Sequence, residues 1–110
     1  MPVVLVRRKE KGEKVARFLT GHAATPGIRY DYEHSTLNLP WPYQAIVTTG
    51  AQHWRFMEAA RNLPHDRIAA VIRYDNYVES IDEAVVGMRL DTYAQLMQVH
   101  YETTSRKLDD

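Results

Sequence analysis

The chain has 110 residues, no cysteine and no net charge, with 14 basic and 14 acidic side chains. This length fits one domain with its own core and is too short for two. The lack of cysteine excludes disulfides, thiolate catalysis and cysteine-ligated metal centres within this sequence. The balanced charge differs from the basic excess of a dedicated nucleic-acid binder.

The amino-terminal residues 3–6 (VVLV) form a continuous apolar run, which predicts a short strand buried on both faces. Charges follow this run instead of preceding it, and no apolar run has the length that spans a membrane. We therefore expect a cytoplasmic protein without membrane contact. The basic cluster from Arg7 to Lys14 is interrupted by Glu10 and Glu13, a composition typical of a solvated face.

Two further elements are predicted before residue 43. Residues 12–20 form a helix, because their apolar side chains gather on one side at helical spacing. Residues 28–34 (IRYDYEH) alternate between apolar and charged, which indicates a half-exposed strand. The connection over residues 35–42 is unusually apolar for a loop, and its prolines around Trp41 oppose regular strand pairing.

The middle of the chain reads as strand, helix and strand, over residues 43–49, 51–63 and 67–74. The same four residues, Ile-Arg-Tyr-Asp, occur at 28–31 and at 72–75. Two strand–helix–strand units predict a ferredoxin-like βαββαβ sandwich of the α+β class, with charged Ile-Arg-Tyr-Asp strands at both edges. The alternative is a small doubly wound α/β sheet.

Residues 80–83 have the Ser-x-x-Glu form of a capping box and could open a short helix that ends at Gly87. Residues 85–90 could instead pair as an extra edge strand. A long amphipathic helix is predicted over residues 91–108. Its apolar side carries Tyr93, Leu96, Met97, His100, Tyr101 and Leu108.

The turn after residue 47 joins a strand to a helix amino terminus, which can bind an anion through free backbone N–H groups. Thr48, Thr49, Gly50 and His53, with Asp75 from the next strand, would form such a site. The turn lacks the Walker lysine and the dinucleotide glycine spacing, and no catalytic residue is predicted. The five histidines show no metal-ligand spacing, so we expect neither a metal nor another cofactor.

Seven tyrosines and two tryptophans favour recognition over chemistry. The leading hypothesis is therefore a small protein-binding or regulatory module that acts as a homodimer. The predicted contact residues are Leu39, Trp41, Tyr43, Trp54, Tyr93, Met97 and Tyr101. The alternatives are a small enzyme or anionic-metabolite binder at the strand–turn–helix site, and nucleic-acid binding through the Arg7 to Lys14 cluster.

Overall fold

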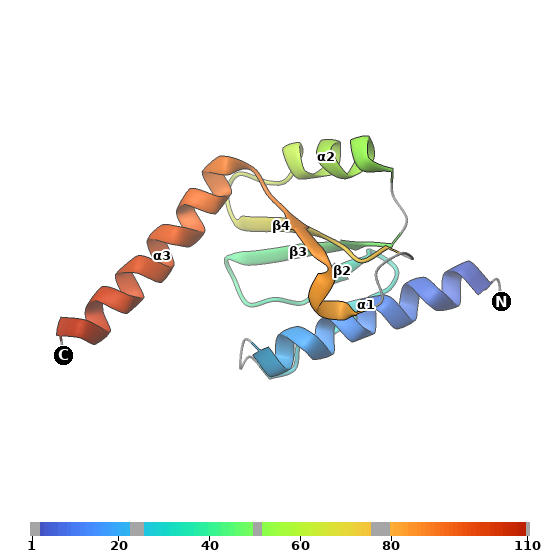
Figure 1. Ribbon diagram of the computed structural model, residues 1–110, viewed down its shortest axis with the longest axis horizontal. Coiled ribbons are helices and arrows are strands. Elements are labelled where there is room, and N and C mark those ends of the chain that lie inside the picture. Colours follow the sequence, from blue (N-terminus) through green and yellow to red (C-terminus); the bar gives the residue numbers. More distant parts are fainter. Residues whose placement is uncertain (1–2, 23–25, 50–51, 76–79, 110) are drawn as a thin grey trace.

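The computed structural model describes residues 3–22, 26–49, 52–75 and 80–109, with side chains placed between residues 9 and 105. These residues form an α+β fold in which a mixed five-stranded sheet carries one helix on each face and a third helix leaves one end (Figure 1). The elements are α1 (Val3–His22), β1 (Tyr30–Asp31), β2 (Thr36–Leu37), β3 (Tyr43–Thr48), α2 (His53–Arg61), β4 (Ile68–Arg73), the 3-10 turn η1 (Ile81–Glu83), β5 (Val85–Gly87) and α3 (Leu90–Asp109).

The strands lie in the order β1-β2-β3-β4-β5. Only β3 and β4 run parallel, and α2 connects them, as the sequence predicts for this unit. The other neighbours pair antiparallel. Both central strands contain an apolar run, over residues 45–47 of β3 and residues 68–72 of β4, which suits strands that are covered on both faces.

Alternate residues of the central strands build two separate cores. The core under α1 contains Val15, Ala16, Ile28, Leu37, Ala45, Val47, Ile72 and Tyr74. The core under α2 contains Phe56, Ala60, Leu63, Ala69 and Val71. Since successive side chains of a strand point to opposite faces, neighbouring residues such as Val71 and Ile72 belong to different cores.

The amino-terminal strand prediction was wrong, because residues 3–6 form the first turns of α1. The predicted helix over residues 12–20 is confirmed as the second half of the same element. No glycine or proline interrupts residues 3–11, and the helix penalty of β-branched residues is only a few tenths of a kcal/mol, about 0.5 each. In addition, β3 already has β2 and β4 as neighbours, so the described sheet offers no central place to an amino-terminal strand.

The half-exposed strand predicted over residues 28–34 shrinks to Tyr30–Asp31. The Asp31 carboxylate accepts hydrogen bonds from the Glu33 amide at 3.0 Å and from the His34 ring at 2.7 Å, which bends the chain into a turn. The contact with His34 lowers the pKa of Asp31 and raises the pKa of the imidazole. The chain then returns as β2, where Leu37 is buried although the sequence predicts a connection.

The α+β class is confirmed, but the ferredoxin-like order is not. The chain begins with a helix, and the two parallel strands are direct neighbours instead of being separated by another strand. The first Ile-Arg-Tyr-Asp segment lies at the β1 edge as expected. The second lies in β4, which is an inner strand because β5 covers its outer side.

Both alternatives for residues 80–90 are present in part. Ile81–Glu83 form one 3-10 turn, and Val85–Gly87 form the edge strand β5. The carboxy-terminal helix is confirmed, starts one residue earlier than predicted and continues to Asp109.

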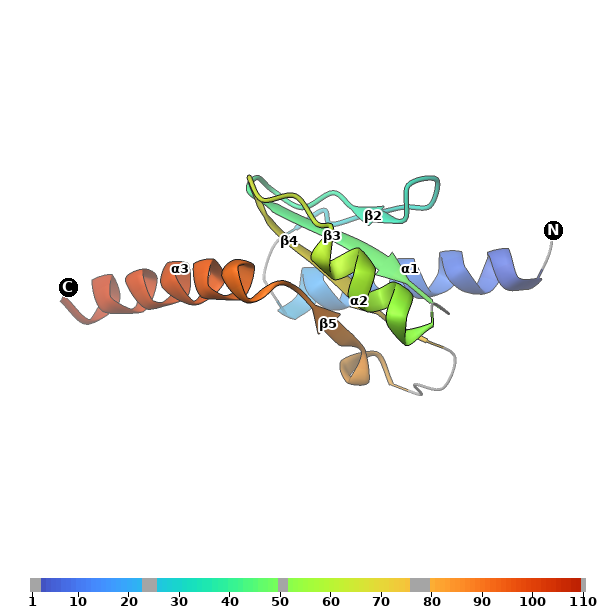
Figure 2. The same cartoon turned by 90° about the horizontal axis from the view of Figure 1, so that it is seen from above.

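Helix α3 gives the molecule its elongated shape. Its axis leads away from the sheet, and only its first turns approach the rest of the fold (Figure 1, Figure 2). The radius of gyration is 14.9 Å, and the longest dimension is 54 Å. A compact chain of this length would have a radius of about 13 Å. The structure therefore presents a 20-residue helix beside the domain instead of over the sheet.

Candidate functional site

Arg89 fixes the start of α3 to the domain. Its guanidinium donates hydrogen bonds to the carbonyl oxygens of Arg61 (3.4 Å), Leu63 and Pro64 (3.2 Å), which lie at and beyond the end of α2. Its Nε also donates to the Asp91 carboxylate at 3.0 Å. A cation at a helix carboxy terminus binds free carbonyls and complements the helix dipole. One partly buried side chain thus joins α2, the loop after it and α3.

Asp91 completes this anchor in the first turn of α3. Its carboxylate accepts the backbone N–H of Thr92 at 2.8 Å and lies 3.6 Å from the His65 ring. Desolvation raises the pKa of Asp91, but the hydrogen bonds from Arg89 and from the Thr92 amide outweigh it, so the pKa lies below its ordinary value. Asp91 therefore stays ionised at neutral pH and holds Arg89 in place.

Of the described side chains in helix α3, only one at its base is buried. Thr92 is only 2% exposed at the base of the helix, whereas Tyr93, Met97 and Tyr101 are 49%, 55% and 75% exposed. At about 100° per residue, Thr92 lies roughly 140° around the axis from Met97. We call the exposed row of Leu90, Tyr93, Met97 and Tyr101 the α3 stripe. Together with Leu96 and His100, three of these side chains line a shallow apolar groove on the helix.

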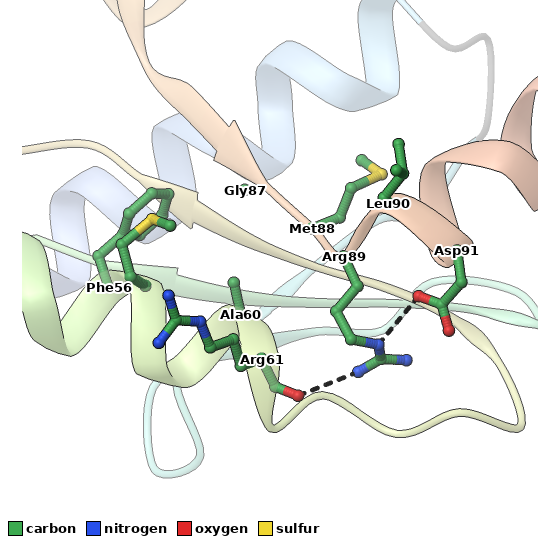
Figure 3. Close-up of a pocket in the computed structure, with 9 residues that line it drawn as sticks. Phe56, Ala60, Arg61, Gly87, Met88, Arg89, Leu90 and Asp91 are labelled. Carbon is green, nitrogen blue, oxygen red and sulfur yellow. Dashed lines mark hydrogen bonds and ion pairs between the residues drawn. The ribbon is translucent and has the colours of Figure 1, made fainter.

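An apolar pocket of about 470 Å³ opens beside the start of α3 (Figure 3). Phe56, Met57 and Ala60 line it from α2, and Gly87, Met88 and Leu90 line it from the β5–α3 connection. Figure 3 shows Arg89 and Asp91 at the end of the pocket where α3 begins. The pocket and the α3 stripe are thus neighbouring apolar surfaces, since Leu90 belongs to both.

Trp41 lies near the same end of the sheet. The Arg67 guanidinium stacks 5.0 Å from the centre of its ring, and the ring is 69% exposed. Arg67 is two residues from His65, which contacts Asp91 in α3. The loop between α2 and β4 therefore connects Trp41 with the base of α3.

The other predicted contact residues are distributed differently. Leu39 packs against the core under α1, and Tyr43 is partly buried at the start of β3. Trp54 is exposed, but it lies in the first turn of α2, whereas Arg89 binds the last turn of that helix. Its ring nitrogen donates to the Gln52 side chain at 2.6 Å. The structure therefore brings Trp41, Tyr93, Met97 and Tyr101 towards one end and places Trp54 elsewhere.

The predicted strand–turn–helix site is only partly described, because Gly50 lies outside the described residues. Thr48 ends β3 opposite Arg73 of β4, and the Arg73 guanidinium lies 3.3 Å from the Asp75 carboxylate. His53 begins α2, and Thr49 follows β3 and is partly buried. The Thr48 hydroxyl is buried without a hydrogen-bond partner among the described residues. The carboxylate beside Arg73 opposes binding of an anion there, since it already neutralises the cation.

Among the described residues, no three His, Asp or Glu side chains cluster so as to hold a metal ion. The basic cluster lies on α1, where Lys11 stands 5.0 Å from the centre of the Tyr74 ring. Within the same described part of the chain, no helix combines the length and the apolar character needed to span a bilayer.

Sequence reasoning missed Arg89 as the anchor of α3. The carbonyls that it binds belong to residues 25 to 28 positions earlier in the chain. Local spacing does not signal such a contact.

Comparison with known proteins adds nothing about this site, since no family model, curated protein or solved structure matches the chain.

Proposed function

We propose that this chain is a protein-binding module and that the α3 stripe is its contact surface. The observation that carries the proposal is a 20-residue helix that leaves its own domain and exposes an apolar row with two tyrosines and a methionine. Exposed apolar patches that contain aromatic residues and methionine are typical of protein contact sites. The pocket between α2 and β5 extends this surface at the base of the helix, because Leu90 belongs to both. The exposed ring of Trp41 lies at the same end of the sheet.

The stability of α3 supports the same proposal. Helices in proteins owe most of their stability to packing of an apolar face, not to intrinsic propensity. Threonine and valine, which are unfavourable in helices, occupy positions 92, 99, 103 and 104 of α3. Beyond its anchored first turn, this helix gains little from its own domain, so a bound partner would supply the missing packing.

Native mass spectrometry of the chain, purified gently from its own cells, tests this function. We expect recovery in a protein complex, and we expect Met97→Asp to lower the recovered complex at least about tenfold, because a charge would be buried in the contact. Gln95→Asp is the matched control. It adds the same charge two residues away, at an exposed position about 160° around the helix from Met97.

Two results would contradict the proposal. One is recovery of the free 12.8 kDa chain alone. The other is a complex that Met97→Asp and Gln95→Asp affect equally. An added mass of a few hundred daltons, on the order of a drug-sized ligand, would favour the small-molecule site near Thr48 and Asp75 instead.

A further inference from the structure

We infer that the partner of the α3 stripe is a second copy of this chain, and that the two α3 helices pair antiparallel with Met97 near the two-fold axis. This inference rests on the proposed function. It names the partner and its orientation, which the exposed helix alone does not specify.

The arrangement of the stripe supports a second copy. Tyr93 and Tyr101 stand four residues before and four residues after Met97. When a second α3 is placed antiparallel across Met97, each Tyr93 comes to the same level as Tyr101 of the second copy. The row is therefore complementary to itself, as a two-fold symmetric contact requires. Tyrosine pairs around a flexible methionine also form a compact apolar contact.

The helix dipoles favour the antiparallel orientation over the parallel one. In a parallel pair, the two positive amino termini lie at one end and the two negative carboxy termini at the other. In an antiparallel pair, the amino terminus of each helix lies beside the carboxy terminus of the other, so opposite ends of the dipoles meet. The zero net charge of the chain adds no long-range repulsion between copies.

The same arrangement gives a role to the pocket beside α3. The helix is about 30 Å long, so an antiparallel neighbour reaches from Met97 back to the base of the first helix. Its last turns then approach the pocket formed by Phe56, Met57 and Met88. The two-fold axis repeats this contact, so each copy places its last turns near the pocket of the other. Both α3 stripes are then covered, and the assembly stops at two copies.

Single cysteines test the orientation, because the natural chain contains none. A disulfide needs Cα atoms within about 7 Å of each other. In the antiparallel pair, two copies of Met97→Cys meet at the axis and form a cross-linked dimer under mild oxidation. Two copies of Tyr93→Cys are separated by about 12 Å along the axis and do not cross-link. A mixture of Tyr93→Cys with Tyr101→Cys gives a mixed dimer, and Gln95→Cys is the control off the stripe.

Sedimentation analysis of the unmodified protein accompanies the cross-linking. A dimer with the pattern above supports the inference. Efficient cross-linking between two copies of Tyr93→Cys indicates parallel helices and overturns the orientation. A monomer at every concentration, without cross-linking of any variant, overturns the second copy as partner. The proposed function then survives only if Met97→Asp, but not Gln95→Asp, removes a different protein from the purified complex, so the two failures are distinguishable.

Discussion

Replacing Arg89 with alanine is expected to lower the free energy of unfolding by about 2–4 kcal/mol, because the carbonyls of Arg61, Leu63 and Pro64 lose a charged donor. The change also removes the partner of the Asp91 carboxylate. Equilibrium denaturation in urea measures the loss.

Two further variants separate the hydrogen-bond network from simple charge. Arg89→Lys keeps the charge but cannot reach several carbonyls with a planar fork, so we expect an intermediate loss of stability. Arg61→Ala removes a neighbouring exposed cation while its carbonyl remains, and we expect a change within about 0.5 kcal/mol. Equal stability of Arg89→Ala and Arg61→Ala would show that Arg89 does not anchor α3.

Gly12→Ala is expected to destabilise the protein by about 1–3 kcal/mol, although the same change inside a helix normally stabilises it by about 1 kcal/mol. The reason is the close approach of β1 to α1. A Cβ atom at position 12 would overlap the ring atoms Cγ, Cδ2 and Cε2 of Tyr30. Thermal and urea denaturation both measure the sign of the change.

The same helix provides a control, since a Cβ atom at Gly21 would have open space within 4 Å. Gly21→Ala should therefore leave stability unchanged or raise it by up to about 1 kcal/mol. Combining Gly12→Ala with Tyr30→Ala should cost less than the sum of the two single changes, because the overlap disappears. A stabilised Gly12→Ala variant would contradict the tight packing of Tyr30 on α1.

The sequence was informative where a local pattern sets the structure. The parallel strands β3 and β4, the helix between them and the amphipathic α3 follow from apolar runs and periodicity alone. The first turns of α1 were mistaken for a strand because β-branched residues occur in both elements, and the available neighbours decide between them. The β1 strand was predicted too long because the hydrogen bonds of Asp31 end it.

The candidate site was predictable only in part. The apolar row with Tyr93, Met97 and Tyr101 could be found from helical spacing. The exposure of this row could not be predicted, because an amphipathic helix can equally well pack its apolar side on the sheet of its own domain. In the structure, α1 and α2 cover the two faces of that sheet, and the packing of α1 on Tyr30 depends on Gly12. Arg89, which sets where α3 points, binds carbonyls that are distant in the chain and leaves no local pattern.

Hydrogen exchange of the α3 amides tests most directly whether α3 depends on a protein partner. We measure exchange over residues 94–104 at several protein concentrations, for the unmodified chain and for Met97→Asp. A helix that is stabilised by a second copy should be protected at high concentration and should lose protection on dilution, and Met97→Asp should remove the protection at every concentration. Protection that neither dilution nor Met97→Asp changes would contradict the α3 stripe as a contact surface.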